Sequence, residues 1–109
     1  MTIQTTDLDL GDDLVITKVL RQPAGGSGTW VRGRLHGHRF DALVFPGHAE
    51  NADWELGDSQ ISKLWIQRIA NKQTVFNWDR GMDIPAADEV ACAIADFLAG
   101  GLTDYIFAK

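Results

Sequence analysis

Three segments in the first half of the chain have the pattern of strands, and in two of them the side chains alternate between an apolar face and a polar face. Residues 14–20 (LVITKVL) are rich in β-branched side chains and lie between a Gly-Asp-Asp turn signal and a proline. Residues 29–35 and 38–45 flank His36-Gly37, where the glycine can supply the positive φ of a tight turn. The pattern predicts one strand followed by a β-hairpin.

The two-residue turn also predicts the register of this hairpin. One face then carries the pairs Leu35–His38, Gly33–Phe40 and Val31–Ala42, and the other carries Arg34–Arg39, Arg32–Asp41 and Trp30–Leu43. The first face is apolar, so it belongs in the core. The second combines basic side chains with an Arg–Asp cross-strand pair, so it belongs outside.

A second hairpin is predicted over residues 61–69 (ISKLWIQRI) and 73–78 (QTVFNW), joined through Asn71-Lys72. If this turn is tight, Trp65 and Trp78 become cross-strand neighbours. The two hairpins supply four strands, and the first segment can add a fifth.

One strong helical pattern follows the second hairpin. Asp83 is a candidate N-cap and Pro85 suits the first turn, where its missing N–H costs nothing. The apolar stripe of the helix consists of Val90, Ile94, Phe97 and Leu98. Gly100-Gly101 is predicted to end the helix, and the apolar tail, 102–109, is predicted to form another helical turn or an edge strand.

These elements predict an α+β fold: a four- to five-stranded, mainly antiparallel sheet with one C-terminal helix packed on one face. Residues 1–109 are expected to form a single domain, because 109 residues suffice for one core. The start of the chain lacks signal-peptide features and no apolar stretch approaches the ~20 residues of a membrane helix, so a cytoplasmic protein is expected. The single cysteine excludes an intrachain disulfide.

Charge changes sign in blocks along the chain, although the net charge is −5. Residues 1–13 carry four acids and no base, and are expected to be a flexible acidic N-terminus. Residues 46–60 form a long acidic loop, and loops of this length in small domains are functional or poorly ordered. The predicted strands are basic. The charges therefore offer an acidic and a basic surface.

Each surface favours a different partner. The acidic loop would contact a basic protein surface or a nucleoprotein complex. Its candidate residues are Glu50, Asp53, Trp54, Glu55 and Asp58. The basic strands would instead bind nucleic acid, with aromatic side chains that stack on bases. The candidate residues of this sheet face are Arg32, Arg34, Arg39, Lys63 and Arg68.

Metal binding is poorly supported by the spacing of the possible ligands. The side chains that could converge on a metal are His36, His38, His48, Glu50 and Asp53. No His-x-x-x-His pair or cysteine pair fixes a chelate among them. Neither a metal nor another cofactor is predicted.

Catalytic chemistry has few candidates. Cys92, Ser59 and Ser62 lack a neighbouring base or a nucleophile motif, and Cys92 is expected to be a small, partly buried residue of the helix. Asp79 and Asp83 bracket a strand-to-helix junction, where they could serve a small hydrolase. A structural role explains this pair as well, with one aspartate capping the helix and the other pairing with a base of the sheet.

Two segments carry a family resemblance: GTWVRGRLHGHRFDALVF, and ISKLWIQR with the following NWDRGMDIP. They resemble a family of small bacterial proteins of unknown function that is frequent in phages, plasmids and integrative elements. The matching motif positions are Ser62, Lys63, Asp79, Arg80 and Gly81. The resemblance implies an accessory protein of a mobile element and carries over no catalytic residue. Asp79 and Arg80 are expected to tie the second hairpin to the helix start, around a sharp turn at Gly81.

The function predicted first is therefore a non-enzymatic accessory protein that binds a partner macromolecule, for example an inhibitor that occupies a host-defence nucleoprotein complex through its acidic surface. The alternatives are a nucleic-acid-binding module that uses the basic sheet face and a small hydrolase that uses Asp79 or Asp83. No membrane partner is expected, and the sequence leaves open whether the protein is a monomer or a homodimer.

Overall fold

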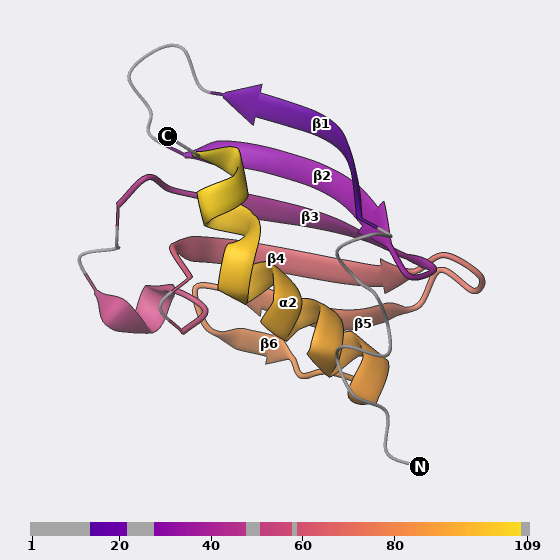
Figure 1. Cartoon of the computed structure of the whole chain (residues 1–109). Helices are drawn as coiled ribbons and strands as arrows, with labels where there is room; N and C mark the ends of the chain where they lie inside the picture. The colour runs from indigo at the N-terminus through magenta and orange to yellow at the C-terminus, as the bar shows by residue number, and fades with distance from the viewer. Residues whose placement is uncertain (1–13, 22–27, 48–50, 58, 108–109) are drawn as a thin grey trace.

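A single antiparallel sheet with one long helix across it forms the framework of the computed structural model, which describes residues 14–21, 28–47, 51–57 and 59–107 (Figure 1). The sheet has six strands among these residues, and each pairs with its neighbour in the chain. The strands are β1 (Val15–Arg21), β2 (Thr29–Leu35), β3 (His38–Val44), β4 (Ile61–Arg68), β5 (Thr74–Asp79) and β6 (Met82–Ile84). A 3-10 helix, η2 (Ala52–Trp54), precedes β4, and the helix α2 (Glu89–Ile106) follows β6.

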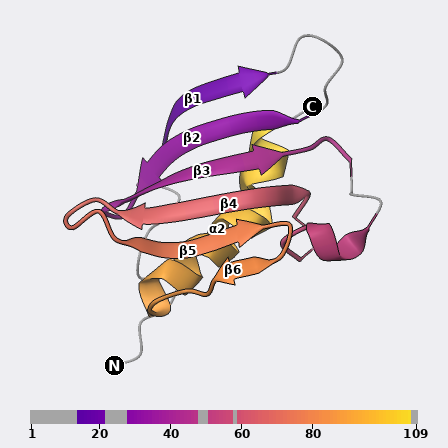
Figure 2. The ribbon, with the colours of Figure 1, turned by 180° about the vertical axis from the view of Figure 1, so that it is seen from behind.

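The helix covers one face of the sheet, and the core lies between them. Figure 1 shows α2 crossing this face obliquely, and Figure 2 shows the opposite face with no described element over it. Side chains that are buried in the core include Val31, Phe40, Ala42, Leu64, Ile66, Ile94 and Leu98. None of the described helices is long and apolar enough to cross a membrane. The predicted α+β architecture, with one C-terminal helix on an antiparallel sheet, is confirmed.

The predicted register of the first hairpin is confirmed pair by pair, from Leu35 opposite His38 to Trp30 opposite Leu43. Its turn places His36 at φ 48° and Gly37 at φ 70°, the two left-handed residues of a type I′ turn. Burial alternates strictly along β2, with Val31, Gly33 and Leu35 buried. The face predicted for the core therefore lies under α2.

The sheet contains one strand more than the predicted maximum of five. The extra strand is β6, whose residues Met82–Ile84 pair with β5 after a turn at Arg80-Gly81. Three residues are too few to show an alternating pattern, and Asp83 with Pro85 imitates a helix start. The prediction of Asp83 as N-cap is wrong. Asp88 caps α2, because its Oδ1 accepts a hydrogen bond of 2.8 Å from the backbone N–H of Ala91.

The helix does not end at Gly100-Gly101 but continues to Ile106, so residues 102–106 of the tail are helical and do not form an edge strand. The stripe of Leu98, Leu102 and Ile106 is buried against the sheet. Each helical glycine costs about 1 kcal/mol relative to alanine, whereas each buried leucine or isoleucine contributes about 1.5–3 kcal/mol. The Thr103 hydroxyl also donates to the backbone carbonyl of Ser59. Tertiary burial therefore outweighs the two glycines.

The second hairpin is confirmed as β4 and β5, but its two tryptophans are not neighbours. Trp65 lies opposite Asn77, and Trp78 lies opposite Leu64. The connection spans more than two residues, and the register shifts between Ile66 and Gln67. Adjacent rungs of a ladder point to opposite faces, so Trp65 points away from α2 whereas Trp78 packs against the core.

Candidate functional site

Figure 2 shows the sheet face opposite α2, called the outer face below. The strand register places polar and aromatic residues on this face in three rows across the strands. The register gives one row as Leu20, Trp30, Leu43, Lys63 and Asp79. The second row is Lys18, Arg32, Asp41, Trp65 and Asn77. The third is Val15, Arg34, Arg39, Gln67 and Thr74. These rows bring together five bases and two acids.

Three of the five cations have partners on the outer face. Arg32 Nε lies 2.9 Å from Asp41 Oδ1, and Lys63 Nζ lies 3.6 Å from Asp79 Oδ1. Arg39 Nε donates to Gln67 Oε1 at 2.7 Å, and its guanidinium lies 5.6 Å from the centre of the Trp65 ring. That stack gives the middle of the face a flat cationic surface.

The side chains of the other two cations, Lys18 and Arg34, make no ion pair or hydrogen bond within the described part of the chain. Arg34 also lies directly opposite Arg39 in the ladder between β2 and β3. Like charges in this position destabilise a sheet. The pair therefore contributes nothing favourable to folding, and it concentrates positive charge on an open surface.

A hollow of about 310 Å³ opens on the outer face over β1, β2 and β3. The residues that line it are Lys18, Leu20, Trp30, Val31, Arg32 and Asp41. Trp30 is 36% exposed and Leu20 is 49% exposed, so the hollow offers an aromatic surface with charged groups beside it. The sequence did not reveal Lys18 or Leu20 as site residues, because the partner and register of β1 were not predictable from its pattern.

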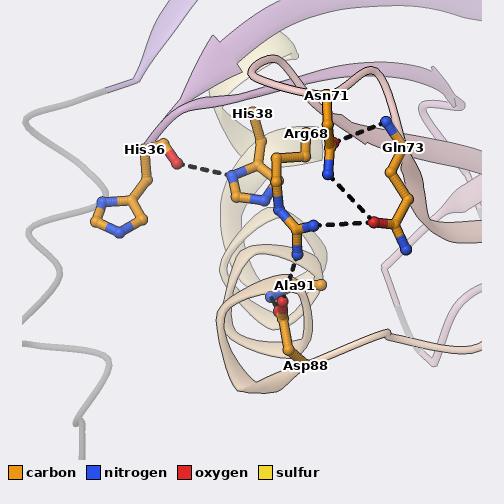
Figure 3. Close-up of polar contacts among 7 residues, drawn as sticks. All are labelled: His36, His38, Arg68, Asn71, Gln73, Asp88 and Ala91. Atoms are coloured by element: carbon orange, nitrogen blue, oxygen red, sulfur yellow. Dashed lines mark hydrogen bonds and ion pairs between the residues drawn. The ribbon is translucent and has the colours of Figure 1, made fainter.

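Arg68, the fifth residue predicted for the basic face, lies elsewhere. Its position in β4 alternates with Gln67 and so points to the helix side, where Nη2 lies 2.6 Å from Asp88 Oδ2 (Figure 3). Its other terminal nitrogen donates to Gln73 Oε1 at 3.0 Å. Arg68 therefore links the sheet to the start of α2. This pair performs the tethering role that was predicted for Asp79 and Arg80.

His38, one of the histidines considered as possible metal ligands, has a structural contact instead. His38 is buried, and its Nδ1 donates to the His36 carbonyl at 2.7 Å (Figure 3). A carbonyl only accepts, so Nδ1 carries the hydrogen of this bond. His48 and Glu50 lie outside the described residues, within which no group of three His, Cys, Asp or Glu side chains could hold a metal ion.

Not all of the residues predicted to bind a partner through the acidic loop are exposed. Glu55 is only 5% exposed, and its Oε1 accepts a 2.7 Å hydrogen bond from the backbone N–H of Gln60. The prediction that Glu55 lies on the surface is wrong, because the carboxylate holds the loop in shape. Asp53 and Trp54 are exposed on η2. Glu50 and Asp58 lie outside the described residues.

The two aspartates considered for hydrolysis have ordinary structural partners. Asp79 pairs with Lys63, and Asp83 Oδ2 accepts a hydrogen bond of 2.8 Å from Asn77 Nδ2. Arg80 does not pair with Asp79 but donates its backbone N–H to the Ser62 carbonyl at 2.9 Å. These contacts shape the turn between β5 and β6. They provide no evidence for the predicted hydrolase.

Cys92 is exposed on α2, so the prediction that it is partly buried is wrong. The stripe that faces the sheet contains Ala91 and Ala95 instead. Partial desolvation against the helix raises the pKa of the Cys92 thiol, and the Asp96 carboxylate, whose Oδ2 lies 3.9 Å from Sγ, raises this pKa further. The thiolate is the nucleophile, so Cys92 is expected to react slowly with electrophiles near neutral pH.

Asp96→Asn is expected to speed alkylation of Cys92 by iodoacetamide at pH 8, by roughly a factor of two to five. Removing the carboxylate lowers the thiol pKa and increases the thiolate fraction. Asp104→Asn, which removes the same charge three turns away, serves as the control. Equal rates for Asp96→Asn and the wild type across pH 7–10 would show that the carboxylate has no influence.

Comparison with protein families identifies one match, to the family described as Domain of unknown function (DUF7678), over residues 29–102. The match spans more than half of the chain and runs from β2 into α2. Neither the curated proteins nor the solved structures contain a match.

Proposed function

Since the chain belongs to the DUF7678 family of domains of unknown function, we propose from its geometry that it is a non-enzymatic module that binds single-stranded nucleic acid on the outer face. The observation that carries this proposal is the third row of the outer face, where Arg34 lies directly opposite Arg39. A strand phosphate placed between two guanidinium groups would relieve their repulsion and gain charge-assisted hydrogen bonds. Lys18 extends the same positive surface to the edge of the sheet.

Aromatic side chains favour a single strand over a duplex. Trp30 is exposed on the outer face, and Trp65 lies under the Arg39 guanidinium. Bases stack on such surfaces only when they are unpaired, and each stacked base contributes about 1–3 kcal/mol. An open antiparallel sheet with bases on its surface and phosphates on its arginines is a common arrangement for single-strand recognition.

The net charge of −5 does not oppose this proposal, because the described outer face carries five bases against two acids. Glu89, Asp96 and Asp104 are exposed on α2, on the other side of the sheet. Charges farther apart than the Debye length of about 8 Å are largely screened at physiological salt. The local potential of the outer face therefore governs contact with a phosphate backbone.

The acidic-surface inhibitor of a host-defence complex has less support. Glu55 is internal, which leaves Asp53 and Trp54 as the described members of that surface. The role in a mobile element remains a prediction from resemblance. Both ideas concern the biological setting, and neither conflicts with binding of nucleic acid on the outer face.

The test is titration of fluorescently labelled single-stranded 12-mers of RNA and DNA, followed by polarisation at 50–200 mM salt. The wild-type protein is expected to bind with an affinity that falls as salt rises. Arg34→Gln with Arg39→Gln is expected to weaken binding about tenfold or more and to reduce the logarithmic salt slope by about 1.4, since each phosphate contact on a single strand contributes about 0.7.

The matched control is Arg34→Lys with Arg39→Lys, which keeps both charges at the same positions. It should retain most of the salt slope, whereas a loss equal to that of the glutamine pair would point to disruption of the sheet. Circular dichroism of each variant shows whether the sheet is still folded. The proposal fails if neither 12-mer binds in a salt-dependent way, or if the glutamine pair binds as the wild type does.

A further inference from the structure

The hollow over β1, β2 and β3 combines an aromatic surface with a hydrogen-bond acceptor and donors at its margin. Its volume of about 310 Å³ lies at the lower end of small-molecule sites, ~300–1,000 Å³. Resting on the function proposed above, we infer that this hollow receives one base of the bound strand and that the preferred base is guanine. The base stacks on Trp30, and its polar edge meets the pair of Arg32 and Asp41.

The pair of Arg32 and Asp41 supplies both kinds of polar group. The Nε of Arg32 and the Oδ1 of Asp41 are joined at 2.9 Å, whereas Asp41 Oδ2 makes no hydrogen bond within the described residues. The terminal guanidinium nitrogens of Arg32 also make none there. An acceptor and donors therefore lie side by side at the edge of the hollow.

Guanine matches this arrangement better than the other bases. Its polar edge carries a carbonyl oxygen, O6, beside two adjacent donors, the N1–H and the amino group on C2. O6 would accept from Arg32, and the two donors would face the Asp41 carboxylate. Adenine and cytosine each carry only one donor group, beside ring acceptors that a carboxylate repels, and uracil has a single N–H between two carbonyls.

Lys18 completes the hollow on its β1 side. It makes no ion pair within the described part of the chain, and it lies across from Arg32 in the ladder. A lysine ammonium there neutralises a backbone phosphate next to the stacked nucleotide without reading the base. Each part of the hollow thus has its own role. Lys18 binds the phosphate backbone, Trp30 stacks on the base, and the Arg32–Asp41 pair selects guanine.

The experiment compares four 10-mers, oligouridine and the same strand with a single central guanine, adenine or cytosine, as competitors in the polarisation assay. The guanine strand is expected to bind about tenfold more tightly than oligouridine, which is within the range of base discrimination by a bidentate contact. Asp41→Asn is expected to abolish this ratio. The same change should strengthen binding of oligouridine, because it removes a negative charge from the outer face.

The matched control is Asp79→Asn, which removes the other acid of the outer face, outside the hollow. It should strengthen binding of all four strands and leave the guanine ratio unchanged. Equal binding of the four strands to the wild type overturns the inference while the proposed function stands. A guanine preference that survives in Asp41→Asn also overturns it. Absence of binding to any strand removes the proposed function and the inference together.

Discussion

Phe40→Ala is expected to lower the free energy of unfolding by about 3–5 kcal/mol, the range for truncation of a fully buried phenylalanine. Phe40 has no exposed surface and lies in β3 between Gly33 of β2 and Ile66 of β4. It belongs to the core cluster that includes Ile94 and Leu98 of α2. Removing the ring leaves a cavity between sheet and helix that small neighbours cannot fill.

Urea denaturation followed by far-ultraviolet circular dichroism and tryptophan fluorescence measures this loss. A domain of this size has a stability of about 5–15 kcal/mol, so the variant is expected to be close to unfolded or to unfold at low urea. Phe40→Leu should give an intermediate value. Tyr105→Ala, which truncates an aromatic ring that is 64% exposed, should change stability by no more than about 0.5 kcal/mol. Equal midpoints for Phe40→Ala and Tyr105→Ala would contradict the assigned core.

Local rules were sufficient where a short turn sets the geometry. The turn at His36-Gly37 fixes the register of β2 against β3, and alternation then assigns each side chain to one face. This is why Phe40 and Val31 were correctly predicted for the core, and Arg32, Arg34 and Arg39 for the polar face. Both periodicity and turn chemistry act over a few residues, which a single sequence displays.

Packing between distant segments determined the two features that the local sequence pattern predicted wrongly, the end of α2 and its N-cap. Gly100-Gly101 carries a helix-stop signal, but burial of Leu102 and Ile106 extends α2 beyond it. Asp83 has the residue type of an N-cap, but it lies in β6, and Asp88 caps α2. In both cases the competing contact comes from a segment distant in the sequence.

The candidate site was predictable in its charges but not in its shape. Lys63 and the arginines of the first hairpin were recognisable as basic positions of strands. The hollow required the pairing of β1 with β2, which brings Lys18 across from Arg32. Conversely, Glu55 and Arg68 are of residue types that usually lie on the surface. Glu55 instead accepts a hydrogen bond from the backbone of its own loop, and Arg68 forms an ion pair with the N-cap residue of α2. Residue type therefore indicates which strands carry charge, while the fold determines which of these charges reach the outer face.

Gly33→Ala is expected to lower the free energy of unfolding by about 1–3 kcal/mol, the usual cost of overpacking. A Cβ at this position would lie 2.6 Å from the Val15 carbonyl oxygen and 2.9 Å from two carbons of the Phe40 ring. The ring can shift, but the carbonyl belongs to the backbone of β1. The strand must therefore move away from β2. Urea denaturation measures the loss, and amide exchange in β1 locates it.

Gly100→Ala provides the control of opposite sign, because the residue is helical and no atom beyond its chain neighbours and the adjacent helix backbone lies within 4 Å of the added Cβ. It should raise stability by about 0.5–1 kcal/mol through helix propensity.

A double-mutant cycle of Gly33→Ala with Phe40→Leu separates the two clashes at Gly33. If the ring were the main obstacle, the leucine would cancel most of the cost of the alanine. Because the carbonyl of Val15 is closer, most of the cost is expected to remain. The displacement of β1 should also weaken oligonucleotide binding, since Lys18 and Leu20 would leave the hollow. A stable Gly33→Ala variant with unchanged amide exchange in β1 would contradict the close packing of β1 against β2.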